Sequence, residues 1–367
     1  MLYAKELQAL KRAGRYRTRN VVNNSLKDFA SNDYLGLAHN AGLHKQTCNF
    51  LNTQDIHASK ASMLVNGYHQ IHQDFEKALC EANGFEEGVV LGSGFNANIA
   101  LIEALTRKGD TLFMDELYHA SGVLASEIGS INVVFFPHND MDALRKLLQK
   151  STAKRNIVAV EGIYSMDGDI CPKELFSIVD EYENCVLIVD EAHSSGVVGE
   201  HLMGVFDHYN IEIKPNYIKM GTLGKAYGSF GAFILASSHI VEYLLNRAKP
   251  LIYATSLSLY DTKLAHYSLE YIIQNAAMLT QEIQARKEII KESFGISVDG
   301  LIVPLHVGDN KKVIAIKEQL LQHKIAVGAI RQPTVPSAII RLIARLGESK
   351  EELLRVCALL QKYGVQA

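Results

Sequence analysis

Cysteine is scarce in this sequence, and no two cysteines stand at the spacing of a metal site or a redox motif. The five cysteines are scattered over 367 residues. Without a CxxC pair, neither a disulfide framework nor a structural zinc site is predicted. Each cysteine is instead typical of a small buried apolar side chain in a reducing compartment.

Long apolar runs and long basic runs are also missing. No run of about eighteen apolar residues occurs, so the sequence contains no candidate transmembrane helix. Residues 1–20 carry Lys and Arg among their apolar positions, which is not the pattern of a secretory signal. The formal net charge is −3, which argues against nucleic acid as a main partner. We therefore expect a cytoplasmic protein that binds neither membranes nor nucleic acid.

What the chain does have is a regular alternation of short apolar runs and amphipathic helical segments. It is 48% hydrophobic and 21% charged, as soluble globular proteins are. The apolar runs at 110–116 and 185–190 are each linked to segments with helical spacing, a pattern of βαβ units around a mostly parallel sheet. Segment 257–294 has almost no helix breaker and is predicted to be one long helix. We expect an N-terminal segment at 1–35, a large domain at 36–256, and the linking helix with a smaller C-terminal α/β domain at 257–367.

The most distinctive stretch is YIKMGTLGKAYGSFGA, residues 217–232, in which Lys225 stands among four glycines. Glycines let the backbone come close to a ligand, so this lysine can be held in a fixed direction. Taken alone, a Gly-Lys pair is most often a turn that carries a solvated cation. The stretch is not a phosphate-binding P-loop, because Lys219 and Ala226 stand where that motif needs Gly and Ser or Thr.

A second distinctive segment, CVLIVDEAH, places a carboxylate and an imidazole after an apolar run. The run is predicted to be a buried parallel strand that ends at Asp190, and His193 follows it. Ligands of open α/β sheets bind beyond the carboxyl ends of the strands. Together with Lys225, this pair suits a cofactor with a cationic ring nitrogen and an aldehyde, such as pyridoxal phosphate. A zinc hydrolase that uses Asp190 and His193 is an alternative, but no third ligand stands at a suitable spacing.

A Gly-Ser-Gly turn at 92–94 joins a short strand to an apolar helix. Free amides at a helix start bind phosphate, so the backbone of Gly94 and Phe95 is a candidate anion site. The spacing is not G-x-G-x-x-G, which leaves a dinucleotide fingerprint unsupported. On the helix predicted at 67–82, His69 and His72 lack a third metal ligand, and a surface or capping role is expected for them.

With these segments in place, the sequence resembles the α-oxoamine synthases, a family of fold type I enzymes that depend on pyridoxal phosphate. The resemblance covers nearly the whole chain. Its motifs, in the family's order, are SNDYLGL (31–37), NGYHQIHQDFE (66–76), GSGFNAN (92–98), DELYHAS (115–121), EGIYSMDGDICP (161–172), DEAHSSGVVGE (190–200), GTLGKAYGSFGA (221–232) and RQPTVP (331–336).

Two segments depart from the pattern of this family. HASKASM (57–63) replaces a glycine-rich segment that ends in Ser-Arg, so the acyl-chain or CoA contacts of that segment are not carried over. RQPTVP replaces the usual double proline, and we expect the loop to the next strand to be two residues shorter.

The resemblance implies a cofactor site built from the matching residues. Lys225 would hold pyridoxal phosphate covalently and would also remove the Cα proton of the substrate, while Asp190 would pair with the pyridine nitrogen. His193 would donate a hydrogen bond to the ring's 3-oxygen, and His119 would stack on the ring face. The other matching positions are Ser165, Thr222, Gly94 and Phe95, which would contact the oxygen and the phosphate of the cofactor, and Thr255 of a neighbouring subunit. Since Thr255 would come from that neighbour, the resemblance implies a homodimer with shared active sites.

The resemblance also implies how the substrates are held. Asn32 and an arginine near the C-terminus would bind the amino-acid carboxylate, since a planar guanidinium meets a carboxylate with two hydrogen bonds. With the shorter loop, this arginine is Arg341; without the deletion the position would be Ile343, which cannot bind a carboxylate. Further candidates for contacts to the acyl substrate are Arg331, Arg17 and Lys60.

The implied reaction is the decarboxylative condensation of L-alanine with a pimeloyl thioester carried on CoA or on a carrier protein. The nearest alternative is a family member that uses glycine or serine with another acyl-CoA. A binding subunit that has lost catalysis is a further alternative. It is expected to lack the lysine or its aspartate, whereas both Lys225 and Asp190 are present.

Overall fold

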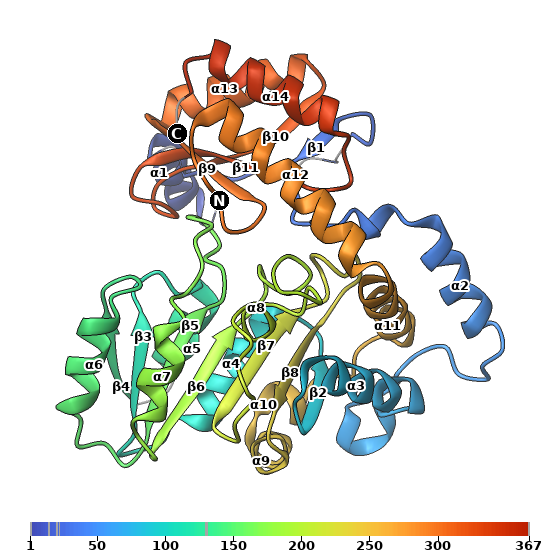
Figure 1. Ribbon diagram of the computed structural model, residues 1–367, viewed down its shortest axis with the longest axis vertical. Helices are drawn as coiled ribbons and strands as arrows, with labels where there is room; N and C mark the ends of the chain where they lie inside the picture. Colours follow the sequence, from blue (N-terminus) through green and yellow to red (C-terminus); the bar gives the residue numbers. More distant parts are fainter. Residues whose placement is uncertain (1, 14, 20, 22, 129–130, 366–367) are drawn as a thin grey trace.

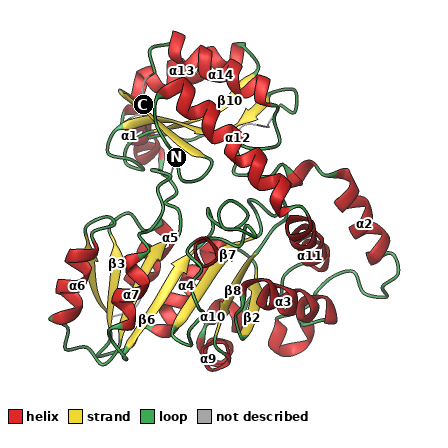
Figure 2. Ribbon diagram, in the orientation of Figure 1, coloured by secondary structure: helices red, strands yellow, loops and turns green. Residues whose placement is uncertain are grey.

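The computed structural model describes residues 2–13, 15–19, 21, 23–128 and 131–365. Two lobes are visible in Figure 1, one built on a seven-stranded sheet and the other on a four-stranded sheet. Helices pack against both sheets (Figure 2), which confirms the predicted α/β class with a mostly parallel main sheet.

The large sheet is parallel except for one strand. Strand β8 pairs antiparallel with both of its neighbours, and the other paired neighbours run parallel. In order across the sheet, the strands are β2 (Glu87–Leu91), β8 (Ala232–Ala236), β7 (Tyr217–Thr222), β6 (Cys185–Asp190), β5 (Asn156–Glu161), β3 (Thr111–Asp115) and β4 (Asn132–Phe136).

The central strands are buried on both faces, because alternate side chains enter two separate apolar cores. Val158 and Val160 of β5 belong to one core, and Ile157 and Ala159 to the other. A parallel sheet covered by helices on both sides needs such continuous apolar strands. The helices of this lobe are α3 (Gln70–Asn83), α4 (Gly94–Leu105), α5 (Ala120–Ile128), α6 (Met141–Gln149), α7 (Glu174–Asp180), α8 (Val205–His208), α9 (Ser238–Arg247) and α10 (Lys249–Ile252).

Polar side chains fix the starts of several of these helices. The Ser93 hydroxyl accepts from the Asn96 N–H at the start of α4, which satisfies one of the free amides there. At α3, the ring of His72 accepts from the His69 N–H at 3.1 Å, so the capping role expected for this pair of histidines is confirmed.

The prediction of a single helix at 257–294 is wrong. Two helices, α11 (Leu259–Gln274) and α12 (Ala276–Phe294), meet at Asn275, whose φ of −114° and ψ of 13° are not helical. The Asn275 side chain donates to the Tyr271 carbonyl at 2.8 Å, and such local bonds compete with the helical ladder. Because of this break, α11 stays against α3 and α2 (Ala41–Leu51), while α12 runs to the smaller lobe (Figure 1).

The smaller lobe combines a segment that precedes the large sheet with segments that follow it. Strand β1 (Lys27–Phe29) pairs parallel with β10 (Ile325–Ile330), with Lys27 opposite Ile325. The Arg345 guanidinium then binds Asp28 and the Asp33 carbonyl, which fixes the turn after β1 between the lobes. The remaining elements are β9 (Ile302–Gly308), β11 (Ala338–Ile343), α13 (Asn310–Gln322), α14 (Lys350–Lys362) and, before β1, α1 (Ala4–Arg12). Over the described residues, no helix has both the length and the apolar content needed to span a bilayer.

Candidate active site

Lys225 lies in a tight turn directly after β7. The turn needs glycine at position 228, where φ is +60° and a Cβ atom would lie 2.4 Å from the backbone nitrogen of Ala38. The Lys225 Nζ lies 2.7 Å from the Nε2 of His193. The other ring nitrogen of His193 is hydrogen bonded to the Tyr34 hydroxyl. The lysine predicted from its glycine-rich setting is therefore held by a buried imidazole.

Burial changes the protonation of this pair. It lowers the pKa of Lys225 to about 8, against the opposing effect of the Asp190 charge. Burial, and then the charge of Lys225, hold the pKa of His193 well below its ordinary value. A neutral imidazole thus accepts from the lysine, and an amine with a pKa near the working pH suits a general base.

Asp190, at the end of β6, is joined to His119 through two side chains of the large lobe. Its carboxylate accepts from Asn98 Nδ2 at 2.9 Å and from the Ala192 N–H at 3.0 Å. Asn98 Nδ2 also donates to the Ser121 hydroxyl at 2.9 Å, and Ser121 lies 2.7 Å from Nδ1 of His119. A single hydrogen-bonded chain therefore positions two of the three residues that were predicted to act on the cofactor ring.

The candidate phosphate site lies where α4 begins. A Cβ atom on Gly94 would lie 3.9 Å from the Thr222 hydroxyl, so this hydroxyl and the first amides of α4 meet at one place. Phe95, the next residue, is 46% exposed. Thr255 is exposed, in the segment after α10, and the next residue donates its N–H to the Ala61 carbonyl.

The structure brings Arg341 together with two other predicted residues. Its Nε donates to the Ser165 carbonyl at 2.7 Å, and its Nη1 donates to the Asn32 side chain at 2.9 Å. Arg341 is 6% exposed, and its Nη2 is buried without a hydrogen-bond partner. An unpaired buried donor of this kind is costly unless a ligand satisfies it, and a carboxylate suits the guanidinium best.

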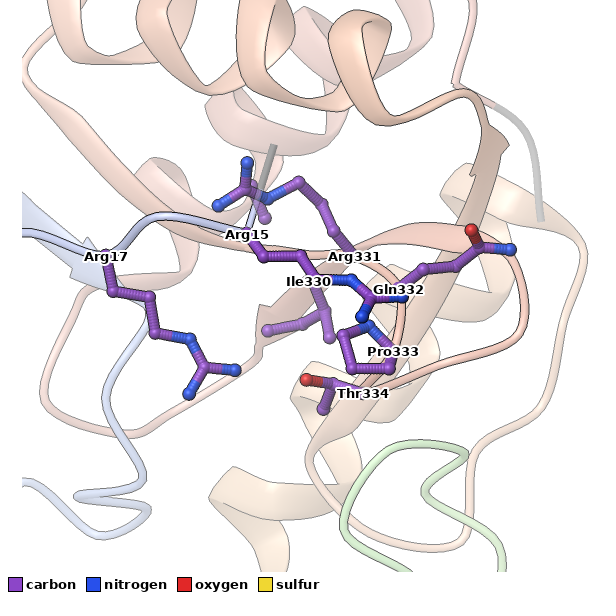
Figure 3. A pocket seen from close by; sticks show the side chains of 8 residues that line it. Arg15, Arg17, Ile330, Arg331, Gln332, Pro333 and Thr334 are labelled. Carbon is purple, nitrogen blue, oxygen red and sulfur yellow. The ribbon is translucent and has the colours of Figure 1, made fainter. Parts of the chain in front are cut away.

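Two cavities adjoin at the smaller lobe, and the larger of them is also lined by residues of the large lobe. The larger, of about 550 Å³, is lined by His119 and Ser165, by apolar side chains, and by the acidic residues Glu116, Glu127 and Asp167. The smaller, of about 180 Å³, is lined by Arg15, Arg17 and Arg331 (Figure 3). The two share Pro333 and Thr334. Arg17 and Arg331 thus lie together, apart from the Lys225 group, while Lys60 is exposed and lines neither of these two cavities.

Four residues that the structure places in or beside the site have no role in the predictions made from the sequence. Tyr34 and Asn98 stand inside motifs that had been recognised, but their hydrogen bonds join distant segments. Asn98 follows Gly94 by four positions, so helical spacing alone places both on one face of α4. Glu161, the last residue of β5, lies beside Asp190 in the neighbouring strand.

The fourth residue is His138, which binds two carboxylates. Its Nδ1 lies 3.0 Å from Asp115 and its Nε2 lies 2.8 Å from Asp169. Although burial alone would lower it, hydrogen bonds and charge from both partners raise the pKa of His138 to about 10. The protonated ring therefore ties the end of β3 to the loops after β4 and β5. His119 and Ser165 lie in the loops that follow β3 and β5.

The alternative of a zinc hydrolase needs a set of metal ligands, which this part of the molecule does not provide. Among the described residues, no three His, Cys, Asp or Glu side chains are placed to hold a metal ion. The polar groups of the site are instead a lysine, a carboxylate in a hydrogen-bonded network, two imidazoles and an arginine with a free donor.

This fold and this site define a transferase of the fold type I class. The aminotransferase class I and II family model matches residues 25–360, and the chain belongs to this family. The chain is 42% identical over 363 residues to 8-amino-7-oxononanoate synthase of Helicobacter pylori (strain ATCC 700392 / 26695), a match that spans 99% of this chain and 97% of that protein.

Solved structures show the same fold. A serine palmitoyltransferase from S. paucimobilis with a bound adduct of pyridoxal phosphate and myriocin has a TM-score of 0.88 at 23% identity, over 99% of this chain and 98% of that one. An 8-amino-7-oxononanoate synthase from Francisella tularensis has a TM-score of 0.77 at 25% identity, over 93% of this chain and 98% of that one.

Proposed function

We propose that the protein is an 8-amino-7-oxononanoate synthase of biotin biosynthesis. It condenses L-alanine with a pimeloyl thioester and releases 8-amino-7-oxononanoate, carbon dioxide and free thiol. The observation that carries the proposal is the 42% identity, over 99% of the chain, to a relative of that name. The groups in the site suit each part of this reaction.

Pyridoxal phosphate is the cofactor, and the residues present fit it. Lys225 would hold its aldehyde carbon, and Asp190 would hold its protonated ring nitrogen. The amides at the start of α4 and the Thr222 hydroxyl, which meet at one place, would bind its phosphate. His119 and His193 would contact the ring. When bound, the cofactor supplies an electron sink for the charge that develops on the substrate Cα.

The protein's own groups bind alanine and move its proton. Arg341 carries a buried donor without a partner, next to Asn32, and together they bind the alanine carboxylate. Lys225, with its pKa lowered to about 8 by burial, removes the Cα proton. His193 stays neutral and accepts a hydrogen bond from the lysine. The ring therefore orients the amine and does not take its proton.

The two adjoining cavities suit an acyl chain that ends in a carboxylate. Leu117, Val123 and Val335 give the larger cavity apolar walls beside His119. A carboxylate at the end of the chain is costly to bury unpaired, and the smaller cavity offers Arg17 and Arg331, together with a third arginine. A palmitoyl chain would gain nothing from these cations.

We also propose that the protein works in the cytoplasm as a homodimer in which Thr255 of each subunit completes the phosphate site of the other. Exposed apolar side chains support this arrangement: Val65, Phe95 and Tyr253 are 77%, 46% and 78% exposed, and they belong to three neighbouring segments. Apolar groups that gather on a surface mark protein interfaces. The free state of all five cysteines suits a reducing compartment.

A crossed substrate assay tests the proposed reaction. Alanine, glycine and serine are each combined with pimeloyl, succinyl, acetyl and palmitoyl thioesters. We expect alanine with the pimeloyl thioester to be preferred in kcat/KM by at least about tenfold, or roughly 1.4 kcal/mol. A preference for glycine with the acetyl or succinyl thioester would assign the protein to another branch of the α-oxoamine synthases.

Two arginine variants test whether the smaller cavity binds the terminal carboxylate of the pimeloyl chain. Arg17→Gln and Arg331→Gln are expected to raise KM for the pimeloyl thioester and to leave KM for the acetyl thioester unchanged, since only the former has a terminal carboxylate. Lys60→Gln is the matched control, because it removes an exposed cation that lines neither of the two cavities.

A further inference from the structure

Glu161 is a buried carboxyl group to which the proposed reaction gives no task so far. It ends β5 directly beside Asp190, the last residue of β6, and register partners in neighbouring parallel strands point to the same face of the sheet. Glu161 is 1% exposed. Its Oε2 accepts from the Ser165 N–H at 3.0 Å, whereas its Oε1 is buried and has no hydrogen-bond partner.

The hydrogen bonds of the two neighbouring carboxyl groups show which one carries the negative charge. Both oxygens of Asp190 accept hydrogen bonds, from Asn98 and from the Ala192 N–H. Glu161 has one donor for two oxygens. Two buried carboxyl groups side by side cannot both ionise at low cost. An oxygen that carries a proton needs no donor, so the proton of Glu161 is assigned to Oε1, where the O–H, like the buried donor of Arg341, is left for a ligand to accept from.

The electrostatic surroundings of Glu161 support this assignment. Burial, and then the charge of Asp190, raise the pKa of Glu161 well above its ordinary value, while Lys225 opposes the rise. The charged or titratable groups that face Glu161 are Asp190, Lys225, Asp115, Tyr34, Tyr118 and Tyr164.

The proposed reaction consumes a proton that Lys225 alone does not provide. Lys225 takes one proton from the alanine Cα, and the freed electron pair forms the bond to the acyl carbon. The C–S bond then breaks, and its electron pair leaves on the thiolate, which needs a proton. Loss of carbon dioxide returns an electron pair to Cα, which needs another. Overall, zwitterionic alanine, the thioester and one proton give the amino ketone, carbon dioxide and the thiol.

The imidazoles of the site are unsuited to hold this second proton. Burial lowers the pKa of His193 and of His119 below the ordinary value, so both rings are neutral near neutral pH and have no proton to release easily. Glu161 differs, because it is a buried acid whose charge and that of Lys225 act on each other.

We propose that Glu161 is a neutral carboxylic acid in the resting site and supplies the proton that the condensation consumes beyond the one removed by Lys225. The inference rests on the proposed function, since the second proton is needed only if the acyl thioester is condensed with loss of carbon dioxide. Glu161 would then be a proton store beside Asp190, and Asp190 would remain the negative partner of the cofactor ring.

Glu161→Gln tests the proposal because glutamine keeps the shape and the neutrality of the protonated acid but has no proton to release. Two reactions are measured on the holoenzyme: exchange of the alanine Cα proton with D2O, followed by NMR, and full turnover with the pimeloyl thioester. We expect exchange within about threefold of wild type and turnover lowered by at least about tenfold, roughly 1.4 kcal/mol. The infrared carbonyl band of a protonated carboxylic acid should also be lost in Glu161→Gln.

The other outcomes overturn the proposal in distinguishable ways. Turnover close to wild type would show that Glu161 releases no proton. Equal losses of exchange and turnover, with the infrared band unchanged, would show that Glu161 is ionised and acts through its charge. If the wild-type protein exchanges alanine but does not condense it with any acyl thioester, the proposed function fails, and the proton supply with it. Glu76→Gln is the matched control, since it neutralises another buried carboxyl, whose pKa burial raises to about 7, outside the site.

Discussion

At the scale of single residues, the glycine-rich turn that holds Lys225 makes a direct prediction about the cofactor. Reduction of the holoenzyme with borohydride should fix pyridoxal phosphate to Lys225, as located by peptide mass spectrometry. Lys225→Ala should bind the cofactor weakly and lose turnover. Lys219, which is also buried, should remain unlabelled because Asn83 and the Met203 carbonyl hold its amine. An adduct on any lysine other than Lys225 would refute the assignment.

Asp190 and His119 are expected to differ in importance although one hydrogen-bonded chain joins them. Asp190→Asn removes the charge that is proposed to stabilise a protonated ring nitrogen, so kcat should fall by roughly 10²–10³-fold or more, the scale of a lost electrostatic contact in an active site. His119→Ala should cost less, because it removes a ring contact and no charge. Steady-state kinetics of both variants measure the two losses, and circular dichroism checks that both variants are folded. Normal turnover of Asp190→Asn would contradict the role assigned to Asp190.

Much of the candidate site could be predicted at this scale, and the exceptions share one physical cause. Lys225, Asp190 and Gly94 stand in local patterns, a glycine-rich turn, a strand end and a helix start, which a single sequence shows. Asn98 and Glu161 act on partners that are distant in sequence. No local pattern indicates such a contact, so the strand order of the sheet has to be known first.

At the scale of elements, His138 connects the loops that carry His119 and Ser165. Its pKa is raised from 6.5 in the unfolded chain to about 10, so its contribution to stability is complete below pH 6.5 and is lost as the pH rises through 10. His138→Gln should therefore lower Tm by a few degrees at pH 6.5, for a loss on the order of 2 kcal/mol. The difference from wild type should vanish near pH 10.

Melting curves at pH 6.5, 8 and 10 test this dependence. The matched control is His201→Gln, since His201 also pairs with an aspartate but has a side chain that is 65% exposed, and exposed pairs contribute little. If the difference between His138→Gln and wild type stays constant over this range, the ring does not act through its charge.

The limits of sequence reasoning at this scale appear at Asn275. The strands and most helices follow from apolar periodicity, which packing enforces along the whole element. The end of α11 depends instead on one asparagine side chain that bonds to the Tyr271 carbonyl. Asparagine also occurs within helices, so only the structure shows that this residue separates two of them.

At the scale of the whole molecule, the proposed sharing of active sites between two subunits predicts that two inactive variants restore each other. Lys225→Ala and Thr255→Glu should each be inactive, the second because a carboxylate would repel the cofactor's phosphate. In a heterodimer of the two, one site contains Lys225 of one subunit and Thr255 of the other. Heterodimers isolated with two different tags should therefore regain activity.

The control for this experiment pairs Lys225→Ala with Asp190→Asn. Both residues belong to the same subunit's site, so no intact site can form in that heterodimer and no activity should return. Equal behaviour of the two heterodimers would contradict a shared site.

The parallel pairing of β1 with β10 has a consequence for the order in which a ribosome completes this molecule. Residues 27–29 are made early, but their partner strand at 325–330 emerges only after the whole seven-stranded sheet has been made. Domains fold as units during synthesis. The large lobe can therefore fold while residues 27–29 are still unpaired, before β10 has been made. The turn with Asn32 and Tyr34 follows β1, and Arg341 lies beyond β10. A nascent chain can therefore assemble Lys225, His193 and Asp190 before it can hold alanine by its carboxylate.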